Sequence, residues 1–128
     1  MYILDSSVYV SAFLEEDSKH IDWINILSNI NTKIFIPYLI FQEVITVLTY
    51  KHSKKLAEAF TDYILKDKRF IITNQDIMEE IWFWKEIDKN LSYIDIVVIY
   101  IAIKYSLKIK TFDKEMDKLY LKINWNLV

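Results

Sequence analysis

Hydrophobic residues follow two alternating patterns along the chain. Short apolar runs bounded by polar residues or by Pro37 are typical of buried β-strands. The predicted strands cover residues 2–4, 33–36, 69–73 and 107–112. Longer stretches with apolar residues at helical spacing predict helices over residues 6–14, 17–29, 38–52, 53–68, 74–90 and 92–103. After residue 113 we expect a short helical turn and a final strand at residues 122–125.

This alternation predicts an α/β fold with a central, mostly parallel sheet of four to five strands and helices on both faces. The 128 residues are expected to form a single domain, residues 1–128, because domains of about 100 to 150 residues are the most common. With 53% hydrophobic residues the chain can bury a substantial core, which excludes a disordered or low-complexity protein.

The chain contains no glycine and no cysteine. Phosphate-cradling loops and the nucleophile elbow of serine hydrolases need glycine, so nucleotide-cofactor and serine-hydrolase functions are excluded. Without thiolates, and with only His20 and His52 as imidazoles, any metal ion must be held by oxygen ligands. Ser6 or Ser7 is expected to cap the first helix, and asparagine at residues 29–31 to replace the left-handed glycine that ends many helices.

The formal net charge of −2 creates no general attraction for nucleic acid, so such binding needs a local basic patch or bridging cations. The first residues lack the basic and apolar regions of a signal peptide. No apolar stretch approaches the ~18 residues of a membrane span. We therefore expect a cytoplasmic protein with no membrane partner.

Four acidic residues stand where a functional site is expected. Asp5 and Asp113 directly follow predicted strands, and open parallel sheets bind ligands beyond the carboxyl ends of their strands. Glu43 and Asp95 lie among apolar residues of predicted helices, where an acid is costly unless it is paired or bound to metal. Simpler roles stay open: Asp5 and Asp113 can be helix caps, and Glu43 and Asp95 can reach solvent or pair with a lysine.

If the four carboxylates converge, they repel one another by about 3 kcal/mol for a pair ~5 Å apart at an effective dielectric of ~20. No lysine or arginine lies within one residue of Asp5, Glu43 or Asp95 to neutralise them. A divalent cation removes the conflict, and oxygen ligands favour Mg²⁺ or Mn²⁺ over zinc. Such a site suits phosphodiester hydrolysis.

Four segments carry these acids: Tyr-Ile-Leu-Asp-Ser-Ser at 2–7, Phe-Gln-Glu-Val-Ile-Thr-Val-Leu at 41–48, Leu-Ser-Tyr-Ile-Asp-Ile at 91–96 and Lys-Thr-Phe-Asp-Lys at 110–114. Their order and spacing over nearly the whole chain resemble the PIN-domain ribonucleases, and most closely the small toxins of VapBC toxin-antitoxin pairs. Members often carry a small residue after the third acid and a glycine before the last strand. This chain has Ile96 and the pair Ser106-Leu107 there.

The resemblance implies a PIN-like fold and an Mg²⁺- or Mn²⁺-dependent endoribonuclease that leaves 3′-hydroxyl and 5′-phosphate ends. It implies RNA as substrate, a cognate antitoxin and a homodimer as partners, and one or two bound ions. It further implies metal ligands and catalytic acids at Asp5, Glu43, Asp95 and Asp113, a fifth acidic ligand at Asp117, and polar supports at Ser7, Ser92 and Thr111.

RNA phosphates need cations, and the densest basic cluster is formed by Lys51, Lys54 and Lys55, after the helix that carries Glu43. We expect this cluster to bind RNA, although a solvated helix junction explains it equally well.

Trp82, Phe83 and Trp84 are consecutive on a predicted helix, so they cover about 200° of its circumference. One core face cannot bury all three, and at least one is expected at an interface with another chain. The alternative is that two are buried and that lysine stems cover the third.

Two other functions remain open. A PIN-like chain can bind RNA or protein without cutting, and the sequence does not exclude a blocked pocket. A phosphoacceptor signalling domain also has a parallel sheet and Mg²⁺-binding acids. It needs paired acids after the first strand and an aspartate ending the middle strand, whereas Asp5 stands alone and residues 69–73 end in threonine.

Overall fold

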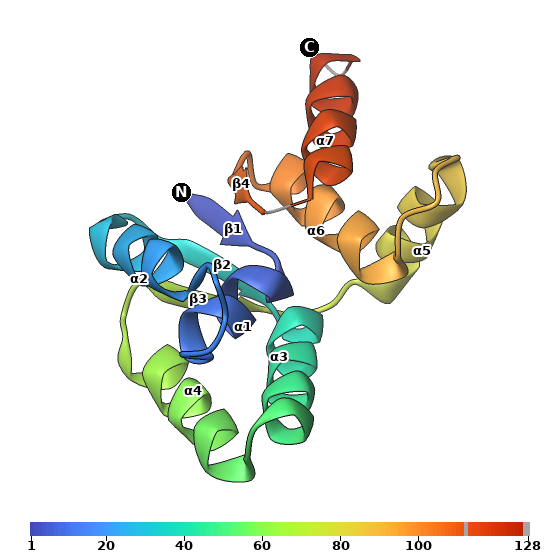
Figure 1. The fold of residues 1–128 in the computed structure, drawn as a ribbon. Coiled ribbons are helices and arrows are strands. Elements are labelled where there is room, and N and C mark those ends of the chain that lie inside the picture. The colour runs from blue at the N-terminus through green and yellow to red at the C-terminus, as the bar shows by residue number, and fades with distance from the viewer. Residues whose placement is uncertain (112, 127–128) are drawn as a thin grey trace.

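The computed structural model describes residues 1–111 and 113–126, and Figure 1 shows their arrangement. In this part of the chain four strands alternate with seven helices. The strands are β1 (Tyr2–Leu4), β2 (Ile34–Pro37), β3 (Phe70–Thr73) and β4 (Lys108–Lys110). The helices are α1 (Ser6–Phe13), α2 (His20–Asn29), α3 (Tyr38–Lys51), α4 (Lys54–Lys66), α5 (Ile77–Glu86), α6 (Tyr93–Lys104) and α7 (Lys114–Asn126). Phe112, the expected end of the last strand, lies outside the described residues.

All strands of the sheet are parallel, in the order β3-β2-β1-β4. The chain passes from β1 to β2 and β3 on one side, and returns to β4 on the other side of β1. Residues 2–4 pair in register with residues 108–110. The predicted α/β fold with four strands is thereby confirmed, and β1 and β4 flank the point where the strand order reverses.

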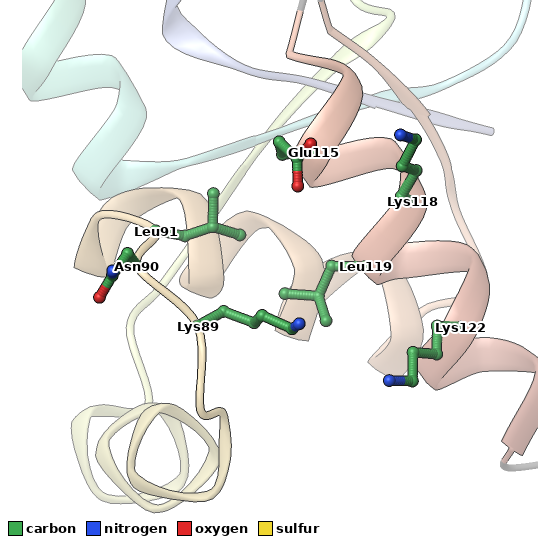
Figure 2. Close-up of a pocket in the computed structure, with 7 residues that line it drawn as sticks. All are labelled: Lys89, Asn90, Leu91, Glu115, Lys118, Leu119 and Lys122. Atoms are coloured by element: carbon green, nitrogen blue, oxygen red, sulfur yellow. The ribbon is translucent and has the colours of Figure 1, made fainter.

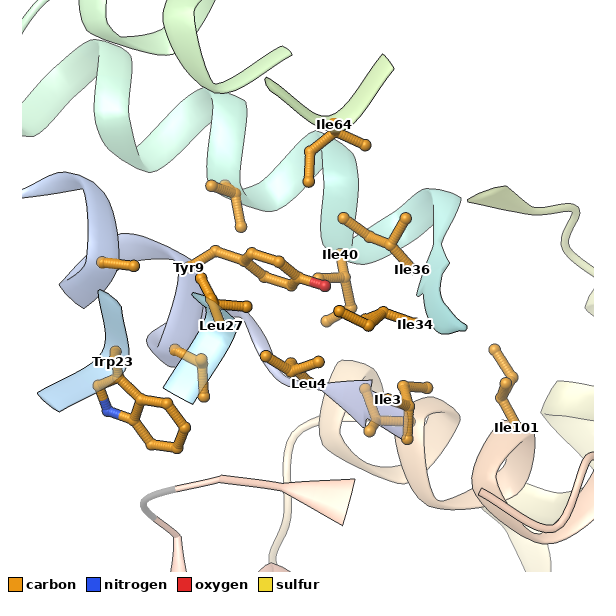
Figure 3. Packing of buried hydrophobic residues seen from close by; sticks show 14 of the residues in the cluster. Ile3, Leu4, Tyr9, Trp23, Leu27, Ile34, Ile36, Ile40, Ile64 and Ile101 are labelled. Carbon is orange, nitrogen blue, oxygen red and sulfur yellow. The ribbon is translucent and has the colours of Figure 1, made fainter. Parts of the chain in front are cut away.

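Helices cover both faces of the sheet, and the core lies between the layers. Helix α1 packs against α2 and α3, and α3 packs against α4, β2 and β3, while α6 contacts β1, β4, α5 and α7 (Figure 1). Side chains of β1, β2, α1 and α3 meet around the fully buried Tyr9 and Ile40 (Figure 3). Helix α6 is apolar around most of its circumference because it is covered on several sides. None of the helices in the described residues is long and apolar enough to cross a membrane.

Two expected caps were wrong. Helix α1 is capped by Asp5, whose carboxylate accepts from the Val8 amide, and not by Ser6 or Ser7. Helix α2 ends at Asn29 and continues into extended backbone at Ile30, so no asparagine there takes the left-handed conformation. Among the described non-glycine residues only Ser106 has a positive φ, of 55°, between α6 and β4. A turn of this shape usually takes glycine, and this chain forms it with serine.

The end of the chain also differs from the prediction. Residues 122–125, expected as a strand, belong to α7, which runs from Lys114 to Asn126. The helix begins with the Asp113 carboxylate accepting from the amides of Glu115 and Met116, and it buries Met116 and Leu119 in the core. Packing of α7 against α6 stabilises the helix as a whole, which a local pattern of alternating polar and apolar residues does not reveal.

Arg69 connects three segments: the end of α2, helix α4 and the turn before β3. Its guanidinium donates to the carbonyls of Leu27 and Ile30 at 2.6 and 2.5 Å, to the Tyr63 hydroxyl at 3.1 Å, and to Asp67 at 2.8 Å. The end of α2 is thereby fastened to the turn between α4 and β3. The hydrogen bond from Arg69 lowers the pKa of Asp67 below its ordinary value of 3.8.

Arg69→Ala should lower the free energy of unfolding by about 3 kcal/mol, because hydrogen bonds of a charged group are lost. Since the folded-state pKa of Asp67 is depressed, the contribution of the Arg69–Asp67 pair to the free energy of unfolding is present above about pH 4. This contribution is lost as the pH falls through the lower folded-state pKa. Urea denaturation at pH 7 and pH 3 measures both effects. The neighbouring exposed cation offers a control, Lys68→Ala, and equal stability of the two variants would contradict the role of Arg69.

Candidate functional site

The carboxyl ends of β1 and β4 meet beside each other at the point where the strand order reverses. Asp5 follows β1, and its amide donates to the Lys110 carbonyl at the end of β4. Thr111 and Asp113 follow β4. Parallel sheets bind ligands at such a point, because the chain leaves the two strands in opposite directions and opens a crevice.

Both carboxylate oxygens of Asp5 are engaged by hydroxyl groups. Asp5 is only 6% exposed. Ser7 donates to Oδ1 at 2.5 Å, and the Val8 amide also points to this oxygen at 3.4 Å. The Thr111 hydroxyl donates to Oδ2. These bonds hold a buried carboxylate in one orientation without supplying a cation to neutralise it.

Thr111 links the two strand-end acids. Its Oγ1 accepts from the Asp113 amide at 3.0 Å while its hydroxyl donates to Asp5. Asp113 is half-buried and caps α7. Each strand-end aspartate therefore caps the helix that follows it, and the simpler role considered for these residues is present. A cap does not exclude a second role, because a carboxylate has two oxygens and about four acceptor sites.

Asp95 lies in the first turn of α6, which Ser92 caps by accepting from the Asp95 amide at 3.2 Å. Burial raises the pKa of the half-buried Asp95 carboxyl. The charges of Asp5, Asp113 and Glu43 raise it further, while a hydrogen bond with Ser92 opposes them. Acids from four distant segments therefore act on one another electrostatically.

Glu43 faces this group from the middle of α3, where Val44 and Ile40 are buried in the core. Its Oε2 is buried and has no hydrogen-bond partner within the described chain. A buried carboxylate oxygen without a partner is costly. Neither solvent nor a lysine takes up this oxygen, so the alternative considered for Glu43 does not account for it.

Asp117 stands one turn after Asp113 on α7 and is exposed. Its pKa is raised by burial of the carboxyl group, then by the charge of Asp5 and, more weakly, of Asp113, while Lys110 lowers it. Asp117 therefore lies at the edge of the acidic group.

The other predicted site residues lie elsewhere. Lys51, Lys54 and Lys55 are exposed at the junction of α3 and α4, where α3 ends. On α5, Trp82 is 67% exposed and Trp84 43%, while Phe83 is partly buried and packs on Tyr100 of α6 at 5.5 Å between ring centroids.

A buried acid outside this group was missed. Glu80 on α5 is 1% exposed and accepts a hydrogen bond from Tyr93 at 3.4 Å. Burial raises its pKa. A signal was available, since Ile77, Phe83 and Trp84 lie three and four residues away on the same helix face.

The PIN-domain family model matches residues 2–122, nearly the whole chain. The chain belongs to the PIN-domain family. In this PIN domain the four acids come from β1, α3, α6 and the turn after β4, in that order. Ile96, where many members have a small residue, is 1% exposed, and Ser106, at the frequent glycine position, takes the left-handed conformation itself.

Among solved structures, the PIN domain is similar to that of VapC20 of Mycobacterium tuberculosis, described as a sarcin-ricin loop cleaving toxin. The TM-score is 0.83, the sequence identity is 14%, and the match covers 93% of this chain and 95% of the other. At this identity the likeness concerns the fold. No curated protein sequence matches the chain.

The donor set fits a hard cation. Its members are carboxylates, and the buried Oε2 of Glu43 has a vacant acceptor position. In their present orientations no three acidic or histidine side chains of the described residues lie close enough to hold one ion. Binding of an ion by these carboxylates would therefore require rotation of their side chains.

Mn²⁺ should raise the melting temperature of the EDTA-treated protein by roughly 8 °C at about 100 times the dissociation constant, equivalent to ~2.7 kcal/mol. Asp95→Asn should abolish this shift. It should also raise the melting temperature in EDTA at pH 7, because the raised pKa means that folding disfavours the ionised carboxylate. Differential scanning calorimetry measures both. Asp62→Asn, an exposed acid on α4, is the control, and an equal Mn²⁺ shift in both variants would contradict the metal site.

Proposed function

We propose that this PIN domain is an Mg²⁺- or Mn²⁺-dependent endoribonuclease and the toxin of a toxin-antitoxin pair. One observation carries the proposal: the Asp95 carboxyl is coupled to Asp5, Asp113 and Glu43 where β1 and β4 end. Carboxylates that lie near one another repel when no cation is bound between them. Metal-dependent phosphodiester hydrolysis needs such carboxylates to hold the ion.

The comparisons support the same class of activity. The family model covers all four acids, and the structural neighbour VapC20 is described as a sarcin-ricin loop cleaving toxin. A nuclease that damages cellular RNA must be restrained, so a cognate antitoxin protein is part of the proposal. We also propose that the protein acts in the cytoplasm, where its RNA substrate is found.

Asp5, Glu43, Asp95 and Asp113 would hold one or two ions, with Asp117 as an outer ligand. When bound, such an ion neutralises the carboxylates, polarises the phosphate and lowers the pKa of a water molecule. Ser7 and Thr111 keep Asp5 oriented through its two oxygens. Ser92 fixes the start of α6 and with it the position of Asp95. The chain's own contribution is thus to place acids from four segments around one phosphate.

Asp5→Asn, Asp95→Asn and Asp113→Asn should each reduce RNA cleavage at least about 100-fold, because each removes a negative ligand from the group. Cleavage of a mixed single-stranded RNA in Mn²⁺, followed by mass spectrometry of the ends, measures the rate and tests for 5′-phosphate products. Asp62→Asn should cleave at the unaltered rate. Wild-type-like cleavage by all three site variants would refute the proposed active site.

A second RNA contact, farther from the acids, is proposed at Lys51, Lys54 and Lys55. Lys51 is eight residues beyond Glu43, or about 12 Å along the axis of α3. At this distance the cluster lies too far to touch a phosphate at the acids. The cluster can attract a neighbouring part of the RNA strand that comes within about the Debye length of the lysines, ~8 Å at physiological salt.

The exposed face of α5 is proposed as the homodimer interface. Met78 and Trp82 are 69% and 67% exposed, and a hollow of about 510 Å³ beside them is also lined by Phe83 and Tyr100. Contiguous apolar surface with aromatic anchors is typical of protein interfaces. Phe83 is turned toward α6, so Trp82 is the main anchor and Trp84 stands at the rim.

The purified protein should sediment as a dimer at micromolar concentration, and Trp82→Glu should convert it to a monomer, because a charge then replaces the buried anchor. Analytical ultracentrifugation measures this. Tyr50→Glu, at an 86% exposed aromatic at the far end of α3, is the matched control and should stay dimeric. A monomeric wild-type chain would exclude the dimer.

A further inference from the structure

A groove with three lysines lies between α7 and the segment that leads into α6 (Figure 2). Its volume is about 420 Å³, within the range of pockets that hold small ligands. Its lining residues are Lys89, Asn90, Leu91, Glu115, Lys118, Leu119 and Lys122.

The groove begins at the two segments that carry Asp95 and Asp113. Leu91 directly precedes Ser92, the cap of α6, and Glu115 is two residues after Asp113. Both segments that bear these acids therefore also contribute walls of the groove.

The α7 wall of the groove is one helix face. Glu115, Lys118 and Lys122 are spaced by three and four residues, so they lie on one side of the helix. Asp117 is one residue from Lys118 and therefore about 100° away around the axis. Helix α7 thus presents an acid toward Asp5 and lysines toward the groove.

The lysines are available for a ligand. The ion pairs of the described residues join Arg69 to Asp67 and Lys104 to Glu79, so none of the groove lysines is held in an ion pair. Glu86 and Asp88 line an adjoining hollow that shares Lys89 and Lys122 with the groove. Figure 2 shows Lys89 reaching across from the loop toward Leu119 on α7. The residues that line the groove itself are three lysines and one glutamate, Glu115, so its own lining is net positive.

Leu91 provides an apolar surface between the cations, and the largely buried Leu119 lies at the floor of the groove. A single-stranded RNA has this alternation of chemistry, because each nucleotide has an anionic phosphate beside the flatter, less polar ribose and base. Proteins bind such strands with basic grooves that also contact the bases. Free phosphate would use the lysines but not the leucines.

We propose that this groove binds the RNA backbone next to the cleaved phosphate, with Lys89, Lys118 and Lys122 contacting phosphates on one side of it. The inference rests on the proposed ribonuclease function, since the groove would supply the cationic contacts to RNA that the acidic group lacks. A polyanion is repelled by carboxylates, so adjacent cations are needed to hold it there.

The test is binding of a fluorescent, mixed-sequence single-stranded 12-mer RNA to the full chain in EDTA, followed by fluorescence anisotropy from about 0.05 to 0.3 M salt. The triple variant K89Q/K118Q/K122Q should bind at least about 10-fold more weakly. Its plot of log affinity against log salt should be shallower by about 2, as expected for three lost phosphate contacts to a single strand.

K19Q/K66Q/K68Q removes the same charge from exposed lysines distant from the groove, and it should bind within about threefold of wild type. If the triple groove variant melts early, the single variants replace it, and each should lower affinity and shorten the salt slope by about 0.7. Absence of RNA binding by the wild type, unchanged binding by the groove variants, or equal loss in the control would each overturn the inference.

Cleavage in Mn²⁺ separates this inference from the proposed function. A wild type that binds RNA through the groove but never cuts it refutes the nuclease and supports the groove. A wild type that cuts RNA, together with a triple groove variant of unchanged KM and salt dependence, refutes the groove and supports the nuclease.

Discussion

The mutual repulsion of carboxylates is the constraint on which the functional end of this PIN domain depends. Asp5 is buried at the end of β1, and its charge acts on Asp95 and Asp117 from other segments. The fold brings these charged groups into electrostatic interaction, although the packing of the hydrophobic core does not require them. Such an arrangement lowers stability, and proteins retain it where a ligand compensates for the cost.

The acids are placed by ordinary features of the backbone. Asp5 and Asp113 each end a strand and cap the next helix, and Asp95 follows the serine cap of α6. Their hydrogen bonds with Ser7, Thr111 and backbone amides fix orientation without neutralising charge. The same side chains therefore serve local structure and site chemistry, and loss of one affects both unless the replacement keeps the shape, as asparagine does.

Lysines are gathered locally in the groove between α7 and the segment before α6. The chain has a formal net charge of −2, yet this groove is lined by three lysines and one glutamate. A small acidic protein can attract a polyanion only through such local patches, because long-range fields are screened within about 8 Å at physiological salt. Helix α7 separates the two charges on adjacent faces.

The sequence by itself determined the order of the four strands and of the first six helices, and it singled out the acids that follow strands, since apolar runs and acids after strands are local patterns. It left open whether Asp5 or a following serine caps α1. It did not predict that Ser106 takes the left-handed conformation or that residues 122–125 are helical. The missed helix hid the groove, because Lys118 and Lys122 were not expected to lie in one element, whereas both belong to α7. The tertiary structure alone decided which acids act on one another and which lysines stand beside them, because those distances depend on packing between distant segments.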